Sequence, residues 1–259
     1  MNPEQDSATD SAAAPRGRGV YWLPNLFTTG TLFGGFYAVV AAIDGNFRNA
    51  GIAVFIAMLF DGLDGRVARW TNTQSDFGKE YDSLCDMVAF GLAPAIVVYQ
   101  WGIEHIAEYG KFWFRFGWIA AFFYAAAAAL RLARFNSRSA VADKKYFEGL
   151  PSPSAAATVA SFVWLISEIE VTGLPALVLG FAITMIIGAL MVSRFPYWSG
   201  KEVNLRGRVP WAYLVIIPIA YMVVNIGPEA LFALFGAYAV SAPFYWLWRK
   251  VFRSKRAAA

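Results

Sequence analysis

The chain is poor in charged residues and in cysteine. Asp, Glu, Lys and Arg make up 15% of its 259 residues, whereas hydrophobic residues make up 58%. This composition excludes a soluble domain of that length. The single cysteine, Cys85, cannot form an internal disulfide, so the chain implies no oxidising compartment. The sequence also shows no fixed-period repeat and no second, soluble domain.

The N-terminus lacks the basic and then apolar layout of a signal peptide. Residues 1–19 are polar and rich in Ala and Ser, and we expect a disordered tail there. Residues 20–250 are expected to form one transmembrane domain. Residues 251–259 are expected to form a basic C-terminal tail.

Eight apolar segments could each cross a membrane as a helix, which predicts an all-α integral membrane protein with about eight transmembrane helices. The segments are Leu26–Ile43, Ala50–Arg69, Asp82–Trp101, Trp113–Arg134, Ser154–Ser167, Leu174–Val192, Trp211–Ile226 and Glu229–Trp248. The fifth is short because Glu168 and Glu170 end it early. Pro94, inside the third, predicts a kink.

The basic residues lie mostly on one side of these segments. If the N-terminus is cytoplasmic, the opposite side keeps only Arg48, Lys111 and Arg115. This asymmetry is what the positive-inside rule describes, and it predicts that both termini are cytoplasmic. The net charge of +4 then reflects cytoplasmic loops rather than a nucleic-acid partner.

Four aspartates stand out in this apolar chain. Asp61 and Asp64 are three apart on the second segment, and Asp82 and Asp86 are four apart at the expected start of the third, so each pair shares a helical face. An aspartate at the centre of a membrane helix costs roughly 2.5 to 3.5 kcal/mol. Antiparallel neighbouring helices would bring all four together, where their repulsion calls for cations. Carboxylate oxygens favour hard divalent ions, Mg²⁺ or Mn²⁺.

These aspartates belong to a longer motif, D-G-x-x-A-R, eight residues, then G-x-x-x-D-x-x-x-D. Its positions are Asp64, Gly65, Ala68, Arg69, Gly78, Asp82 and Asp86, with Asp61 preceding them. The motif resembles the signature of the CDP-alcohol phosphatidyltransferases, and every position is met. The resemblance implies that family's fold, with a catalytic transmembrane domain. It also implies transfer of a phosphatidyl group from a CDP-linked lipid to an alcohol, with release of CMP.

The resemblance also implies residue roles. Asp61, Asp64 and Asp82 would hold the metal, two Mg²⁺ or Mn²⁺ ions, with Asp86 partly shared. Asp86 would also be the catalytic base, because the only histidine, His105, falls in the loop expected on the opposite side. The expected contacts to the CDP-lipid are Gly65, Arg69, Ser75, Gly78, Asn25 and Thr28.

Two later motifs concern the acceptor alcohol. The runs 131–136 (R-L-A-R-F-N) and 149–153 (G-L-P-S-P) look like those of bacterial and archaeal phosphatidylserine synthases. That resemblance implies CDP-diacylglycerol and L-serine as substrates, a homodimer, and a multi-pass protein of the bacterial inner (cell) membrane with a cytoplasmic active site. We expect Arg131, Arg134 and Asn136 to bind the acceptor, the arginines through its carboxylate.

Several alternatives remain open on the residues alone. The two arginines could instead snorkel or bind lipid phosphate. The acceptor could be choline, glycerol phosphate or inositol phosphate, and the donor an archaeal ether lipid. An acidic cluster in membrane helices could also belong to a cation transporter, although such sites usually lie near the midplane with inverted repeats. Neither feature is visible here.

Overall fold

The computed structural model describes residues 22–71, 75–106, 109–138, 146–171, 173–198 and 227–257. Its helices are α1 (Trp22–Ile43), α2 (Phe47–Thr71), α3 (Asp76–Asp86), the π-helix η2 (Met87–Leu92), α4 (Ala93–Ile106), α5 (Lys111–Arg138), α6 (Ser152–Glu168), α7 (Leu174–Val192) and α9 (Pro228–Ala257). Two short strands, β1 (Tyr146–Glu148) and β2 (Pro196–Trp198), complete the described elements. The predominance of helix confirms the all-α class.

Among the residues that the structure describes, five helices are long and apolar enough to cross a membrane. They cover Asn25–Ile43, Asp76–Gly102, Lys111–Ser137, Leu174–Val192 and Pro228–Lys250. Helices also cover the second and fifth predicted segments, but α2 carries several charges and α6 has only 17 residues. The seventh predicted segment, Trp211–Ile226, lies outside the described residues. A multi-pass helical protein is therefore supported, and the number eight stays a prediction.

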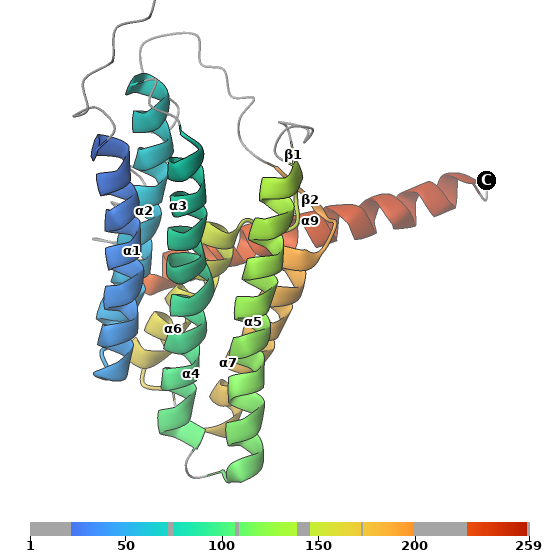
Figure 1. Ribbon diagram of the computed structural model, residues 1–259. Coiled ribbons are helices and arrows are strands. Elements are labelled where there is room, and N and C mark those ends of the chain that lie inside the picture. Colours follow the sequence, from blue (N-terminus) through green and yellow to red (C-terminus); the bar gives the residue numbers. More distant parts are fainter. Residues whose placement is uncertain are drawn as a thin grey trace, which may run out of the picture.

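The helices form a bundle in which α1 to α5 and α7 run side by side, while α9 runs across them and projects beyond β2 (Figure 1). The centre is lined by α6, in which twelve residues are buried, many of them alanines. Small residues bring α1 close to its neighbours. A Cβ on Gly35 would lie 2.6 Å from Ala89 Cα, and one on Gly34 would lie 2.9 Å from Ala57 Cβ. Helix α1 therefore packs against α2 and η2 almost backbone to backbone.

The third helix begins earlier than the apolar pattern indicates. Ser75 caps α3, accepting a hydrogen bond of 3.0 Å from the Gly78 N–H. An N-terminal cap of this kind satisfies a backbone donor that the first helical turn leaves free. The prediction that Asp82 opens this helix was wrong, because hydropathy does not detect the polar first turns. Asp82 and Asp86 instead lie inside α3 and at its end.

Strands β1 and β2 join α5, α7 and α9 at one end of the bundle. They pair antiparallel, with Phe147 opposite Tyr197. The Tyr197 hydroxyl donates to the Ala239 carbonyl at 2.7 Å, which ties β2 to α9. Helix α9 continues to Ala257, so most of the expected basic tail, 251–259, has helical backbone. The expected N-terminal tail, 1–19, lies outside the described residues.

Candidate active site

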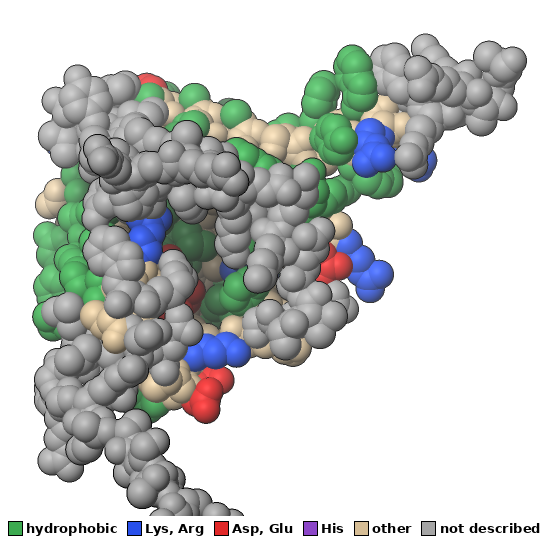
Figure 2. All heavy atoms as spheres, turned by 90° about the horizontal axis from the view of Figure 1, so that it is seen from above, with side chains coloured by type: hydrophobic (Ala, Val, Ile, Leu, Met, Phe, Trp, Pro, Cys, Tyr) green, Lys and Arg blue, Asp and Glu red, His purple; other side chains and the backbone are tan. Residues whose placement is uncertain are grey.

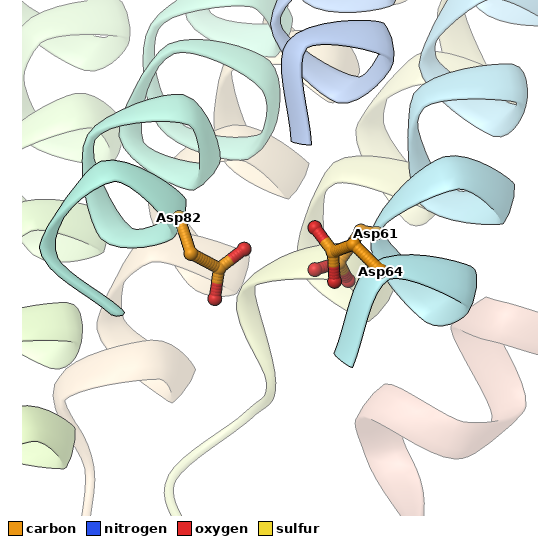
Figure 3. Close-up of side chains that lie close together, drawn as sticks. All are labelled: Asp61, Asp64 and Asp82. Carbon is orange, nitrogen blue, oxygen red and sulfur yellow. The ribbon is translucent and has the colours of Figure 1, made fainter. Parts of the chain in front are cut away.

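Three of the four aspartates converge between α2 and α3. Asp61, Asp64 and Asp82 each offer a carboxylate oxygen, and these oxygens lie within 4.8 Å of one another. Asp82 reaches from α3 toward Asp61 and Asp64 on α2 (Figure 3). The antiparallel arrangement of the two helices produces this convergence, as the helical spacing predicts.

Asp86 joins the same cluster. Its charge interacts with those of Asp61, Asp82 and Asp64. The oxygens Asp82 Oδ1 and Asp86 Oδ1 are buried and have no hydrogen-bond partner within the described part of the chain. Buried carboxylate oxygens without donors are costly unless a cation binds them. The donor set, oxygen only and acidic, suits Mg²⁺ or Mn²⁺.

Helix α1 supports this cluster from the side. The Thr28 hydroxyl donates to Asp64 Oδ2 at 3.0 Å, and both side chains are buried. Its exposed neighbour Thr29 instead makes a 3.0 Å hydrogen bond with the Tyr81 hydroxyl. Thr28, expected to contact the CDP-lipid, therefore also orients a carboxylate of the cluster.

The other expected CDP-lipid residues lie at the same end of α2 and α3. Ser75 is the cap of α3, so its side-chain oxygen already accepts the Gly78 N–H. Asn25 Oδ1 lies 3.9 Å from where a Cβ on Gly78 would be, which brings α1 beside the first turn of α3. Gly65 follows Asp64 on α2. Arg69 is also on α2, and its side chain lies outside the described residues.

Arg131 on α5 is a buried cation whose charge interacts with Asp86 and Asp61. Its Nη1 donates to Ser152 Oγ at 2.8 Å. Its Nε is buried and has no hydrogen-bond acceptor among the residues described. Arg131 therefore brings an unused N–H to the side of the aspartate cluster. The sequence motif 149–153 contained Ser152, but its partnership with Arg131 was not predicted.

Arg134 lies one turn further along α5 and has a different environment. Its guanidinium donates to four backbone carbonyls, at distances from 2.8 to 3.2 Å, those of Glu148, Met191, Val192 and Ser193. These bonds join α5 to β1 and to the end of α7. Asn136 Nδ2 donates to Ser83 Oγ at 2.8 Å, which joins α5 to α3. The structure thus brings Arg131 to the cluster and gives Arg134 and Asn136 partners within the protein.

This end of the bundle is hollowed. A view onto it shows acidic side chains inside the hollow and basic side chains around it, with hydrophobic side chains between them (Figure 2). Cations held by these acidic groups, together with the basic side chains beside them, can neutralise a ligand that carries several phosphate charges.

Comparison with known proteins agrees with this chemistry. Residues 21–195 match the family model for CDP-alcohol phosphatidyltransferase. The CDP-diacylglycerol–serine O-phosphatidyltransferase of Helicobacter pylori strain J99 is 34% identical over 235 residues, which cover 90% of this chain and 94% of that protein. The enzyme of the same name from Mycobacterium leprae is 30% identical over 234 residues, covering 87% of this chain and 69% of that protein.

An archaeal relative is also similar. The archaetidylserine synthase of Methanothermobacter thermautotrophicus is 34% identical over 178 residues, covering 68% of this chain and 69% of that protein. The family model spans more than half of the chain and includes all four aspartates, Arg131 and Ser152. The chain therefore belongs to the CDP-alcohol phosphatidyltransferase family.

Proposed function

We propose that this protein transfers the phosphatidyl group of CDP-diacylglycerol to the hydroxyl of L-serine, giving phosphatidylserine and CMP. The observation that carries this proposal is the cluster of Asp61, Asp64 and Asp82, joined by Asp86, beside Arg131, a buried cation with an unused N–H. The relatives include CDP-diacylglycerol–serine O-phosphatidyltransferases from two bacterial species, and these names support the choice of serine.

In the proposed reaction, Asp61, Asp64 and Asp82 would hold two divalent ions, with Asp86 as a shared ligand. The bound ions would neutralise the pyrophosphate of the CDP-lipid. The serine oxygen forms a bond to the lipid-linked phosphorus as the bond to the CMP oxygen breaks. Asp86 takes the hydroxyl proton as the general base.

For the acceptor, we assign the serine carboxylate to Arg131. A buried guanidinium with an unused N–H can donate to a carboxylate, and this charge-assisted bond is stronger than a neutral one. Arg134, which already donates to four carbonyls, is a weaker candidate than Arg131 for this role. The Asn136 side chain already donates to Ser83, so any effect of Asn136 on the acceptor would pass through Ser83. The CDP moiety would lie against Gly65, Gly78 and Asn25, where α1, α2 and α3 meet.

We further propose that the active site faces the cytoplasm of a bacterial inner membrane, with both termini on that side, as the distribution of basic residues predicts. A homodimer stays a prediction from the family resemblance.

The proposal is tested by CMP release from CDP-diacylglycerol with purified protein and Mg²⁺ or Mn²⁺. Serine is compared with choline, glycerol phosphate and inositol phosphate. Release that depends on serine is expected. Release driven by another alcohol would keep the reaction and discard serine. No release with any acceptor, from folded protein, would contradict the transferase assignment and return the cation transporter to consideration.

A further inference from the structure

The membrane helix that carries Asp82 and Asp86 is interrupted directly after Asp86. Residues Met87–Leu92 form the π-helix η2, and the chain then resumes as α4. The Ala93 N–H bonds to the Val88 carbonyl, five residues earlier rather than four. A π turn contains one extra residue, which rotates the following residues by about 100° relative to a continuous α-helix. The sequence predicted only a kink in this helix, from Pro94.

Pro94 supplies a physical reason for this π-helix. Proline has no N–H, and its ring crowds the carbonyl four residues before it. That carbonyl belongs to Phe90, inside η2. A wider turn relieves the crowding. Because Pro94 has no N–H, the Phe90 oxygen lacks the donor that an α-helix would give it at position 94, and it can accept a hydrogen bond from a neighbouring helix.

Tyr124 on α5 supplies that partner. Its hydroxyl donates to the Phe90 carbonyl at 3.1 Å, and its side chain is completely buried. Two close contacts hold the same segment. Gly35 on α1 lies against Ala89, and a Cβ on Gly91 would lie 3.1 Å from Ala128 Cβ on α5. The π-helix is therefore held between α1 and α5. Tyr124 donates a side-chain hydrogen bond to its backbone.

We propose that Tyr124 and Pro94 are positioning residues for the transfer reaction. Together they maintain the π turn that begins directly after Asp86, and this turn sets the angle at which the face of α3 that carries Asp82 and Asp86 meets Asp61 on α2. Neither residue touches the substrate in this assignment. The inference rests on the proposed function, because it gives Asp86 the role of base.

The first test is Tyr124→Phe, which removes only the hydroxyl. We expect kcat to fall about tenfold, because small misplacements of a reacting group have large effects on rate. The KM values for CDP-diacylglycerol and serine should stay within about twofold, since substrate binding is not altered. Tyr197→Phe is the matched control: its hydroxyl also donates to a buried helix carbonyl, that of Ala239, but away from Asp86. It should lose similar thermal stability and keep its kcat.

The second test is Pro94→Ala, which returns an N–H to position 94 and allows an uninterrupted α-helix. A purely structural role for the interruption predicts an equally or more active and more stable protein. Our proposal predicts equal or higher thermal stability in detergent but a lower kcat. Such a division between stability and rate would not arise from general loosening of the fold.

Asp86→Asn is assayed in parallel so that two failures can be told apart. If Asp86→Asn is inactive while Tyr124→Phe and Pro94→Ala keep the wild-type kcat, the positioning inference is wrong and the proposed function stands. If Asp86→Asn turns over like the wild type, the role of Asp86 as base is wrong. Equal loss of kcat in Tyr124→Phe and Tyr197→Phe would also overturn the positioning inference.

Discussion

Arg131 Nη1 donates a hydrogen bond of 2.8 Å to Ser152 Oγ, which fixes a buried guanidinium at the junction of α5 and α6. The same guanidinium keeps its Nε without an acceptor in the structure as described. A buried charged donor without an acceptor costs free energy unless a bound ligand supplies the acceptor. The arrangement is therefore suited to an anionic group that arrives with the substrate.

Arg131→Lys should raise the KM for serine by about tenfold, because lysine keeps the charge but loses the planar set of donors. The KM for CDP-diacylglycerol should change little. Initial rates of CMP release at varied serine concentrations measure both constants. A KM for serine equal to that of the wild type would contradict the assignment of the serine carboxylate to Arg131.

Arg134→Ala should reduce stability more than it changes substrate affinity. The variant leaves four carbonyls without their guanidinium donor, and we expect a loss of about 3 kcal/mol. Thermal unfolding in detergent should show a clearly lower Tm. The active fraction that remains should have the wild-type KM for serine. A raised KM without a change in Tm would instead return Arg134 to the acceptor site.

Thr28→Val should weaken divalent metal binding by about tenfold, because residues that orient a ligand carboxylate commonly have effects of this size. The measured quantity is the Mn²⁺ concentration that gives half-maximal CMP release. Thr28→Ser, which keeps the hydroxyl, should restore it. Thr29→Val is the control, since Thr29 bonds with Tyr81 rather than with an aspartate. Equal shifts in both valine variants would contradict a specific role for Thr28.

Asp86→Asn should lower kcat by about a hundredfold or more, because it removes the base. Binding of CDP-diacylglycerol, measured directly with labelled lipid, should persist.

Chelation of divalent ions should also stop turnover, and Mg²⁺ or Mn²⁺ should restore it. Turnover that survives complete chelation would contradict the metal assignment, including the role of Asp86 as a shared ligand, and would leave only its role as base.

Gly35→Ala should destabilise the bundle by about 1 to 3 kcal/mol, because its new methyl group would meet the backbone of Ala89. Gly236→Ala on α9 is the control. No atom of the described residues lies within 4 Å of its added Cβ, and alanine is the better helix former there. The Tm values of the two variants should therefore shift in different directions or by clearly different amounts. Similar decreases in Tm would show that the contact of α1 with η2 is not tight.

The aspartate cluster could be predicted from the sequence because helical periodicity fixes which residues share a face. Spacings of three and four brought Asp61, Asp64 and Asp82 together as expected. The same periodicity could not separate Arg131 from Arg134, which are also three apart on one helix. Their different roles depend on Ser152 and on the carbonyls at the end of α7, which lie far from them in the sequence.

The interruption of the third helix at η2 could not be predicted from the sequence. Pro94 indicates that something must change in the third helix, but a kink and a π turn are both compatible with proline. The choice depends on how the neighbouring helices pack, and one of their contacts is a donor to the Phe90 carbonyl. That donor, Tyr124, lies 34 positions later in the chain. Its location is a property of the packed bundle and not of the local sequence.

The two parts of the site also differ in when they are synthesised. All four carboxylates lie between residues 61 and 86, whereas Arg131 and Ser152 follow them by 45 residues or more. Because chains are made from the N-terminus and fold as they emerge, α2 and α3 can meet before the ribosome has added α5. During that interval the cluster has no cation from α5, so divalent ions are the counter-charge available to it. Metal supply during membrane insertion would then affect the yield of folded protein as well as the activity of the mature enzyme.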